Sequence, residues 1–339
     1  MTKKICISGY YGFDNFGDET ILKVLINNLK NYSCNPEITV FSSNPDKTKE
    51  LYQVNAVKSF NIKQVIKELL KCDCLISGGG SLLQDVTSKK SLIYYLAIIS
   101  IATFFRKKVI IFAQGIGPIN DKFLSKLTAF ILKKASYITV RDERSLNLLK
   151  SWNINANLCS DPVWNIQIPL KEKSNKIGIQ LRDFYSLNDD FIKEFAKSIN
   201  KYYSNKEICI LSLQNKLDEK VCNQLKEELL NKNNELNVKV IENNSNDEVI
   251  ENIASLDELI AMRYHACLIG LLSGIKVLPI NYDIKVDELA KEFELNCLNL
   301  DKISEINDSL EQFVSANKSC NKEKLTSLLF DFKTLEERL

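Results

Sequence analysis

Histidine is nearly absent from this sequence, which contains a single one, His265, among 339 residues. Zinc sites usually draw on several histidines and cysteines, and no two cysteines here are spaced C-x-x-C, so we expect no metal site. The presence of a single histidine also means that catalysis by an imidazole can occur only at His265. If the protein uses an imidazole for general acid/base catalysis near neutral pH, His265 is that group.

The sequence also lacks a charge excess and a long apolar run. With 45 basic and 43 acidic residues, it gives no signal for nucleic acid as a partner. The longest apolar run, residues 92–105, is shorter than the roughly 20 residues that cross a bilayer, so no integral membrane segment is expected. We interpret this run as a buried helix. A helix lying on a membrane surface is the alternative, because Arg106, Lys107 and Lys108 follow it directly.

An export signal is missing as well, since the N-terminus enters a strand without the charged and apolar regions of a signal peptide. Ten cysteines are present, and several of them, such as Cys6 and Cys267, lie inside apolar runs. A free thiol in such a place behaves as a small apolar group. We therefore expect a protein of the reducing cytoplasm.

Strand-like apolar runs alternate with helical segments along the chain, which is typical of parallel sheets covered by helices on both faces. A first series fills residues 1–165. Residues 161–175, which contain Pro162 and Pro169, are interpreted as a linker, and a second series follows at 176–320. A final helix is predicted over 321–339, packing back towards the first domain. The sequence thus predicts two Rossmann-like α/β domains with mostly parallel sheets.

Glycine is concentrated in three places: eight of the eleven glycines lie in GYYGFDNFGDE from Gly9, GGGSLLQD from Gly78 and AQGIGPI from Ala113. Each stretch follows a predicted strand, and we expect each to be a loop that leads into a helix. A tight turn explains any one of them, whereas three together favour a shared ligand site. The spacing fits neither the dinucleotide fingerprint nor a P-loop.

Arg263 and His265 stand where a predicted strand ends and a buried helix begins, the usual place for a ligand in an open α/β sheet. His265 also keeps helical register with Leu268 and Ile269, so a buried core histidine remains an alternative. A position at the helix start would favour the neutral imidazole, and Arg263 would supply a fixed charge beside it.

Three further charged residues are candidates. Arg141 and Arg182 each follow a predicted strand, where a guanidinium can pair with a carboxylate or phosphate of a substrate. A structural ion pair, with Asp142 or Glu143 for Arg141 and with Asp183 for Arg182, explains each of them equally well. Asp18, after Gly17, could cap a helix, or it could face the ligand as an acceptor or base.

Five segments resemble the polysaccharide pyruvyl transferases, in particular the CsaB type, and they occur in the order found in that family. They are GYYGFDNFGDETIL, GGGSLLQDVTSKKSLIYYL, AQGIGPI, VRDERS and AMRYHACLIGLLSGIKVLPINYDIKVD, which begin at Gly9, Gly78, Ala113, Val140 and Ala261. The resemblance implies two Rossmann-like domains that face each other across a cleft, as in GT-B glycosyltransferases. One departure is Tyr264, where the family usually has leucine.

The resemblance also implies an activity, namely transfer of a pyruvyl group from phosphoenolpyruvate to a sugar of a cell-wall glycan precursor, forming a cyclic ketal. No cofactor is implied besides this donor. Carried over by position, His265 would shuttle protons, while Arg263, Arg141 and, as a weaker candidate, Arg182 would hold the anionic groups. Asp18 would position or deprotonate an acceptor hydroxyl. The motif residues expected in the substrate site are Asn15, Gly79, Gly80 and Gln114.

Two other functions are compatible with the same scaffold: a GT-B glycosyltransferase that uses a nucleotide sugar, and a non-catalytic glycan-binding protein. The first needs a site for a base and ribose, and no acidic residue is clearly placed for ribose. If the acceptor is lipid-linked, the protein would work at the inner face of the membrane as a peripheral protein.

Overall fold

The computed structural model describes residues 2–172, 174–242, 245–316, 325 and 327–339. It divides into two compact units, Met1–Ile166 together with Ser327–Leu339, and Gln167–Thr326. Each unit contains one sheet, and every strand pairing among the described residues is parallel. The prediction of two α/β units with parallel sheets is thus confirmed.

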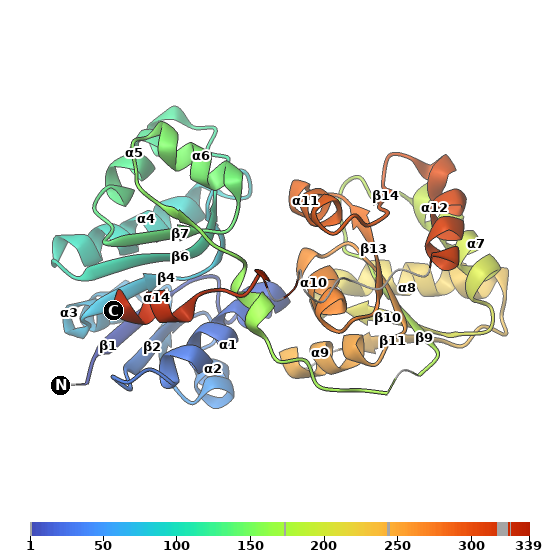
Figure 1. Cartoon of the computed structure of the whole chain (residues 1–339), viewed down its shortest axis with the longest axis horizontal. Coiled ribbons are helices and arrows are strands. Elements are labelled where there is room, and N and C mark those ends of the chain that lie inside the picture. The colour runs from blue at the N-terminus through green and yellow to red at the C-terminus, as the bar shows by residue number, and fades with distance from the viewer. Residues whose placement is uncertain (1, 173, 243–244, 317–324, 326) are drawn as a thin grey trace. The chain divides into compact units, whose positions relative to one another are not determined.

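The first unit has an eight-stranded sheet in the order β3-β2-β1-β4-β6-β7-β8, with β5 paired to β6 (Figure 1). Its strands are β1 (Lys4–Ser8), β2 (Glu37–Ser42), β3 (Asn55–Lys58), β4 (Cys74–Ser77), β5 (Gly80–Leu83), β6 (Lys108–Ile116), β7 (Tyr137–Val140) and β8 (Asn157–Leu158). Its helices are α1 (Phe16–Lys30), α2 (Pro45–Tyr52), α3 (Ile62–Lys71), α4 (Lys89–Phe104), α5 (Lys122–Leu132), α6 (Glu143–Ser151), the 3-10 helix η1 (Pro162–Asn165) and α14 (Phe332–Glu337).

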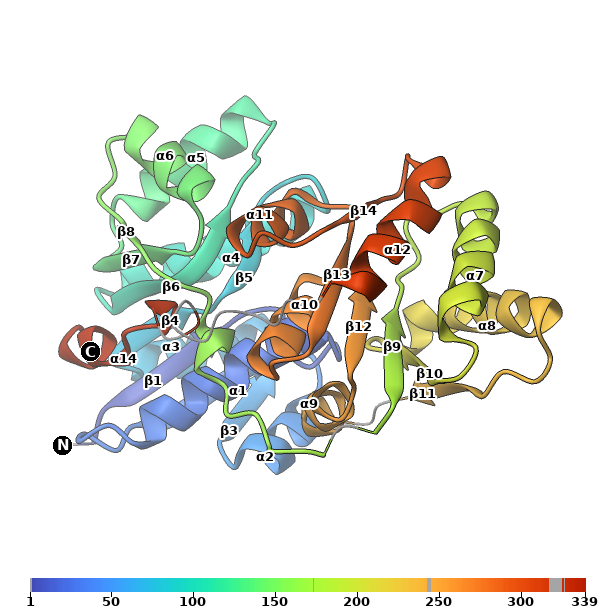
Figure 2. The ribbon, with the colours of Figure 1, turned by 45° about the vertical axis from the view of Figure 1, so that its right-hand side comes forward.

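The second unit has a six-stranded sheet in the order β11-β10-β9-β12-β13-β14 (Figure 2). Its strands are β9 (Lys176–Gln180), β10 (Glu207–Ser212), β11 (Val238–Glu242), β12 (Glu258–Ala261), β13 (Lys276–Asn281) and β14 (Leu298–Asn299). Its helices are α7 (Asp189–Tyr203), α8 (Asn215–Lys232), α9 (Asn246–Ala254), α10 (Tyr264–Leu272), α11 (Ile284–Glu292), the 3-10 helix η2 (Ile303–Glu305) and α12 (Ile306–Ser315). This is the strand order of a Rossmann sheet.

Helix α4 accounts for the longest apolar run of the sequence. One side of it enters the core of the first unit, where Leu92, Leu96 and Ile99 are almost completely buried. The interpretation as a buried helix therefore holds for this side of the run, whereas Ile93 and Phe104, which are 50% and 80% exposed, lie in solvent. Within the described residues, no helix combines the length and the hydropathy that spanning a bilayer would require.

Two of the three glycine stretches differ from the prediction of a loop that leads into a helix. Gly80 begins strand β5, and Gly115 lies inside β6, which continues to Ile116. The extension of β6 is stabilised by its pairing with β5, in which Gly80 lies opposite Gln114 and the buried Leu83 opposite Ile116. Only the first stretch leads directly into a helix, α1.

The C-terminal segment does not form the single helix that the sequence predicts, and part of that range lies outside the described residues. The described helix is the short α14, which begins after Asp331, whose side chain caps it. The segment packs on the first unit, because the Tyr32 hydroxyl donates to the carbonyl of Phe332 at 2.7 Å and the Phe330 ring lies 4.9 Å from that of Phe112.

Replacing Phe330 with alanine tests this packing. The ring is only 7% exposed and contacts Phe112 on β6, so its loss should lower the free energy of unfolding by about 3 kcal/mol. Leu329→Ala, at a neighbouring side chain that is 52% exposed, is the control and should cost less than about 1 kcal/mol. Urea unfolding followed by circular dichroism measures both, and equal effects would contradict the described packing.

Candidate functional site

The second sheet reverses its winding between β9 and β12, which are neighbours although β10 and β11 come between them in the sequence. In open α/β sheets, ligands bind outside the carboxyl ends of the strands at such a point. Arg182 lies two residues after the end of β9, and Arg263 two residues after the end of β12. The topology therefore brings two arginines that are 81 positions apart in the sequence to one edge of the sheet.

Arg263 is held in place by three residues. The Gln180 side chain accepts its backbone N–H at 2.8 Å, and the guanidinium donates to Asp218 at 2.7 Å and to Gln214 at 3.3 Å. The Arg263 side chain is 13% exposed, and that of Asp218 only 1%. The Nε atom of Arg263 is buried and has no hydrogen-bond partner among the described residues. The arginine thus keeps a fixed position, and one of its donors is not used by any residue that the structure describes.

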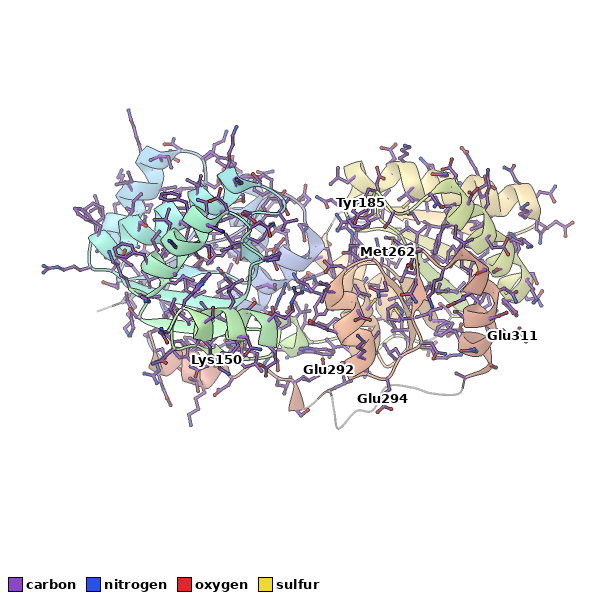
Figure 3. All side chains as sticks on the ribbon, turned by 90° about the horizontal axis from the view of Figure 1, so that it is seen from above. Lys150, Tyr185, Met262, Glu292, Glu294 and Glu311 are labelled. Carbon is purple, nitrogen blue, oxygen red and sulfur yellow. The ribbon has the colours of Figure 1, made fainter. Side chains whose placement is uncertain are left out.

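Arg182 has a similar arrangement. Its backbone N–H donates to the sulfur of Met262 at 3.4 Å; Met262 is labelled in Figure 3. Its guanidinium donates to the Tyr282 hydroxyl at 3.2 Å. The guanidinium carbon also lies over the rings of Tyr282 and Phe184, at 5.2 and 5.7 Å. Its Nε atom, too, is buried without a partner among the described residues. The contacts that hold this side chain do not include Asp183, the acidic neighbour that the sequence suggested as its structural partner.

His265 lies in the first turn of α10, and its ring meets that of Tyr264 edge to face, with centroids 5.1 Å apart. The histidine is partly exposed, whereas Leu268 and Ile269 of the same helix are completely buried. This exposure favours the interpretation of His265 as a buried core residue less than the sequence alone did. No side chain caps the N-terminus of α10, which leaves the partial positive charge of that helix end without a side-chain acceptor from the capping position.

In the first unit, Arg141 forms an ion pair with Asp161 at 2.6 Å and donates to the Ser81 hydroxyl at 3.4 Å. The Arg141 and Asp161 side chains are 7% and 1% exposed. The sequence suggested Asp142 or Glu143 as structural partners. Asp142 instead caps α6 by accepting the N–H of Ser145 at 2.7 Å. Asp161 comes from the segment that the sequence assigned to the linker.

The glycines of the first two stretches make room for side chains of the protein itself. A Cβ atom at Gly78 would collide with the Tyr11 hydroxyl, and one at Gly80, where φ is 103°, would collide with the Asp18 carboxylate. A Cβ at Gly79 would lie 2.8 Å from Ile21. The stretches that begin at Gly9 and Gly78 therefore meet around Tyr11 and Asp18. The third joins them through Gly115, where a Cβ would lie 2.9 Å from Ser81.

Gln114 and Asn15 both act on the backbone of this region. Gln114 is completely buried, and its amide donates to Ser77 and to the carbonyl of Gly78, both at 2.8 Å. Asn15 caps α1 by accepting the N–H groups of Gly17 and Asp18, at 3.1 and 3.3 Å. In this structure both side chains therefore hold the glycine-rich backbone and the start of α1 in place.

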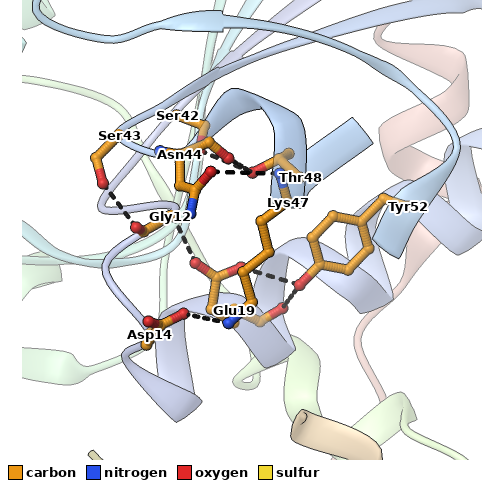
Figure 4. Close-up of polar contacts among 9 residues, drawn as sticks. All are labelled: Gly12, Asp14, Glu19, Ser42, Ser43, Asn44, Lys47, Thr48 and Tyr52. Carbon is orange, nitrogen blue, oxygen red and sulfur yellow. Dashed lines mark hydrogen bonds and ion pairs between the residues drawn. The ribbon is translucent and has the colours of Figure 1, made fainter. Parts of the chain in front are cut away.

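Glu19 fixes the first glycine loop (Figure 4), a role that the sequence did not indicate. Its carboxylate accepts the Gly12 N–H at 2.6 Å and the Tyr52 hydroxyl at 2.9 Å. Burial raises the pKa of Glu19, and these two donors oppose that rise. Ser43 donates to the Gly12 carbonyl at 2.6 Å. The acidic residue directly before Glu19 is Asp18, so this anchoring also fixes the start of α1.

The fold defines a class, an α/β protein with a GT-B-like fold, and in its second unit two arginines and a histidine follow the strand ends at the switch point of the sheet. A family model identifies the chain further, since that of polysaccharide pyruvyl transferases matches residues 15–284. The chain belongs to this family. No curated protein matches the sequence. The described residues contain no group of three or more His, Cys, Asp or Glu side chains that could hold a metal ion.

Solved structures share the fold at low sequence identity. The UDP-GlcNAc 2-epimerase of Neisseria meningitidis bound to UDP-GlcNAc has a TM-score of 0.67 and 12% identity, over 99% of both chains. The UDP-GlcNAc 2-epimerase of Methanocaldococcus jannaschii has a TM-score of 0.66 and 12% identity, over 95% of both chains. HepE of Anabaena in complex with UDP and glucose has a TM-score of 0.61 and 13% identity, over 99% of this chain and 98% of the other. These similarities confirm the GT-B-like fold class and do not establish a substrate.

Replacing Asp218 with asparagine tests how Arg263 is held. Because the pair is buried, removal of one charge leaves the other uncompensated, and the free energy of unfolding should fall by about 2 to 3 kcal/mol. The control is Asp287→Asn, which breaks an exposed pair with Lys291 in the same unit and should cost less than about 1 kcal/mol. Chemical unfolding compares the two variants, and similar losses would show that Arg263 does not depend on Asp218.

Proposed function

We propose that this protein transfers a pyruvyl group from phosphoenolpyruvate to two hydroxyls of a sugar in a surface or cell-wall polysaccharide precursor, as a CsaB-type member of its family. The observation that carries the proposal is the pair Arg182 and Arg263 at one switch point, each with a buried Nε donor that no described residue uses. Phosphoenolpyruvate offers two anionic groups, a carboxylate and a phosphate, and guanidinium groups suit both.

The chemistry requires a proton at the methylene carbon of the donor. We assign this proton transfer to His265. Protonation of the methylene carbon makes the neighbouring carbon, which carries the phosphate oxygen, electrophilic. One acceptor hydroxyl adds to that carbon, phosphate leaves as the C–O bond breaks, and the second hydroxyl closes the ketal. Of the two hydroxyl protons released, one balances the proton taken up by the methylene carbon and the other leaves with phosphate.

The first unit would contribute acceptor chemistry and a further positive charge. Asp18 is proposed to orient an acceptor hydroxyl and to take its proton, and Arg141 to add positive charge for an anionic group. Because Asp161 and Ser81 hold Arg141, its guanidinium would act from a fixed position. Gly79, Gly80, Asn15 and Gln114 would support these groups through the backbone they shape.

His265→Ala is the direct test of the proton transfer. General acid/base groups typically contribute 100-fold or more, so ketal formation should fall by about that factor or disappear. Binding of phosphoenolpyruvate, measured by thermal shift, should persist because Arg182 and Arg263 remain. Activity near that of the unaltered protein would contradict the role of His265. The assay measures phosphate release and the ketal methyl signal in proton NMR, with methyl glycosides as trial acceptors.

The same assay separates the alternative functions. Release of a nucleoside diphosphate from a nucleotide sugar, without phosphate release from phosphoenolpyruvate, would indicate a glycosyltransferase. Saccharide binding without turnover of either donor would indicate a glycan-binding protein. The solved structures bound to UDP compounds share the fold with this chain at 12–13% identity, and they favour neither donor.

We further propose that the protein works in the cytoplasm on a lipid-linked acceptor at the inner face of the membrane. Helix α5 supports this, because its outer side carries Phe123 and Phe130, which are 72% and 60% exposed. Exposed lysines share that side and no acidic residue lies between Lys122 and Arg141. Nearby α4 ends with the exposed Phe104. Aromatic and basic side chains together suit an anionic membrane surface.

Sedimentation with lipid vesicles tests this surface. The unaltered protein should bind vesicles that contain about 30% phosphatidylserine more strongly than neutral vesicles, and added salt should weaken that binding. Replacement of Phe123 and Phe130 together by alanine should reduce binding severalfold. Leu217→Ala, at an apolar side chain of the second unit that is 58% exposed, is the control. Binding that neither the lipid charge nor the two phenylalanines affect would count against the proposal.

A further inference from the structure

Five aromatic rings form a continuous row of contacts at one end of the first unit. Tyr10 and Phe13 stack in parallel with centroids 4.2 Å apart, and Phe13 meets Phe60 at 6.3 Å. Phe60 lies 5.5 Å from Tyr94, which in turn lies 5.2 Å from Tyr95. The first two follow β1, Phe60 follows β3, and both tyrosines lie near the start of α4. In a parallel sheet these positions share the edge formed by the carboxyl ends of the strands.

Both ends of this row, Tyr10 and Tyr95, lie near Asp18. Burial raises the pKa of Tyr10, and the negative charge of Asp18 adds to that rise. The same two causes, burial first, raise the pKa of Tyr95. The middle ring of the row, Phe60, is 64% exposed. The rings therefore extend from solvent, at Phe60, towards the carboxylate proposed to activate the acceptor.

Core packing explains only part of the row. Tyr95 is 4% exposed and belongs to the core, but Tyr10, Phe13 and Tyr94 are half-buried and Phe60 is mostly in solvent. The loop that carries Phe60 is also held, since the Tyr94 hydroxyl donates to the carbonyl of Ser59 at 2.7 Å. A large apolar ring that is fixed in solvent, and that continues a row of other rings, is typical of a ligand-binding surface.

We propose that Tyr10, Phe13, Phe60 and Tyr94, here called the aromatic row, bind sugar rings of the acceptor glycan by stacking. One face of many pyranoses presents several C–H groups, which match the negative face of an aromatic ring. The row contains no cationic side chain, so it suits an uncharged ligand better than a phosphate. This inference rests on the proposed function, since it assigns the acceptor side of that reaction.

The test is saturation-transfer NMR of the whole protein with the methyl β-glycosides of galactose, glucose and N-acetylmannosamine. At least one sugar should receive saturation at the C–H groups of one ring face. Phe60→Ala should weaken its binding about tenfold, the size expected for loss of one aromatic contact. Phe60→Trp should retain binding, and Phe104→Ala, at a ring that is 80% exposed and lies at the far end of α4, should have no effect.

Phe60→Leu distinguishes a sugar from a lipid chain. Leucine keeps an apolar side chain but lacks an aromatic face, so sugar binding should fall as it does with alanine. Full binding by the leucine variant would indicate a merely apolar contact and overturn the proposal, as would a lack of effect in Phe60→Ala. Since this measurement needs no turnover, it separates failure of the aromatic row from failure of the pyruvyl transfer. In an active preparation, Phe60→Ala should raise the KM for the acceptor and leave that for phosphoenolpyruvate unchanged.

Discussion

The parallel pairing of neighbouring strands is the constraint on which the rest of this structure depends. It places the carboxyl ends of all strands of a sheet at one edge, and the reversal of winding leaves one point at that edge open to a ligand. In the second unit this point lies between β9 and β12, and Arg182, Arg263 and His265 all follow the ends of these two strands. The first unit obeys the same rule, with the loops after β1 and β4 at its own reversal. The candidate site residues of the second unit therefore lie just beyond strand ends.

Buried ion pairs then fix what the topology brings together. Arg263 rests on Asp218 and Arg141 on Asp161, and in each pair the carboxylate is 1% exposed. A buried pair of this kind contributes little net stability, because burying two charges offsets most of their attraction. Its effect here is geometric. A long flexible side chain is held in one position, so the remaining donors of the guanidinium point in a fixed direction before a ligand arrives.

The sequence predicted the features that depend on local pattern and not those that depend on distant partners. The strands and helices around His265 follow from apolar periodicity, and Arg263 follows from its place at a strand end. Asp218 could not be recognised, since it lies 45 positions before Arg263 in an ordinary helical segment. Asp161 could not be recognised either, because its partner Arg141 is distant in the sequence and its own segment was interpreted as a linker. Strand β5 was missed because three glycines in a row resemble a turn, and only pairing with β6 shows that the last of them, Gly80, begins a strand.

The glycine motifs show why a correct motif can suggest an incomplete reason. The sequence favoured glycine as space for a ligand, yet Cβ atoms at Gly78 and Gly80 would collide with Tyr11 and Asp18 of the same chain. These contacts bring the Asp18 carboxylate against the backbone, while Glu19 ties the preceding loop to α1 through Gly12. The two successive acidic residues thus contact different parts of the glycine-rich backbone, Asp18 near Gly80 and Glu19 at Gly12. Adjacent positions in a helix point in different directions, which is how two successive carboxylates can take separate roles.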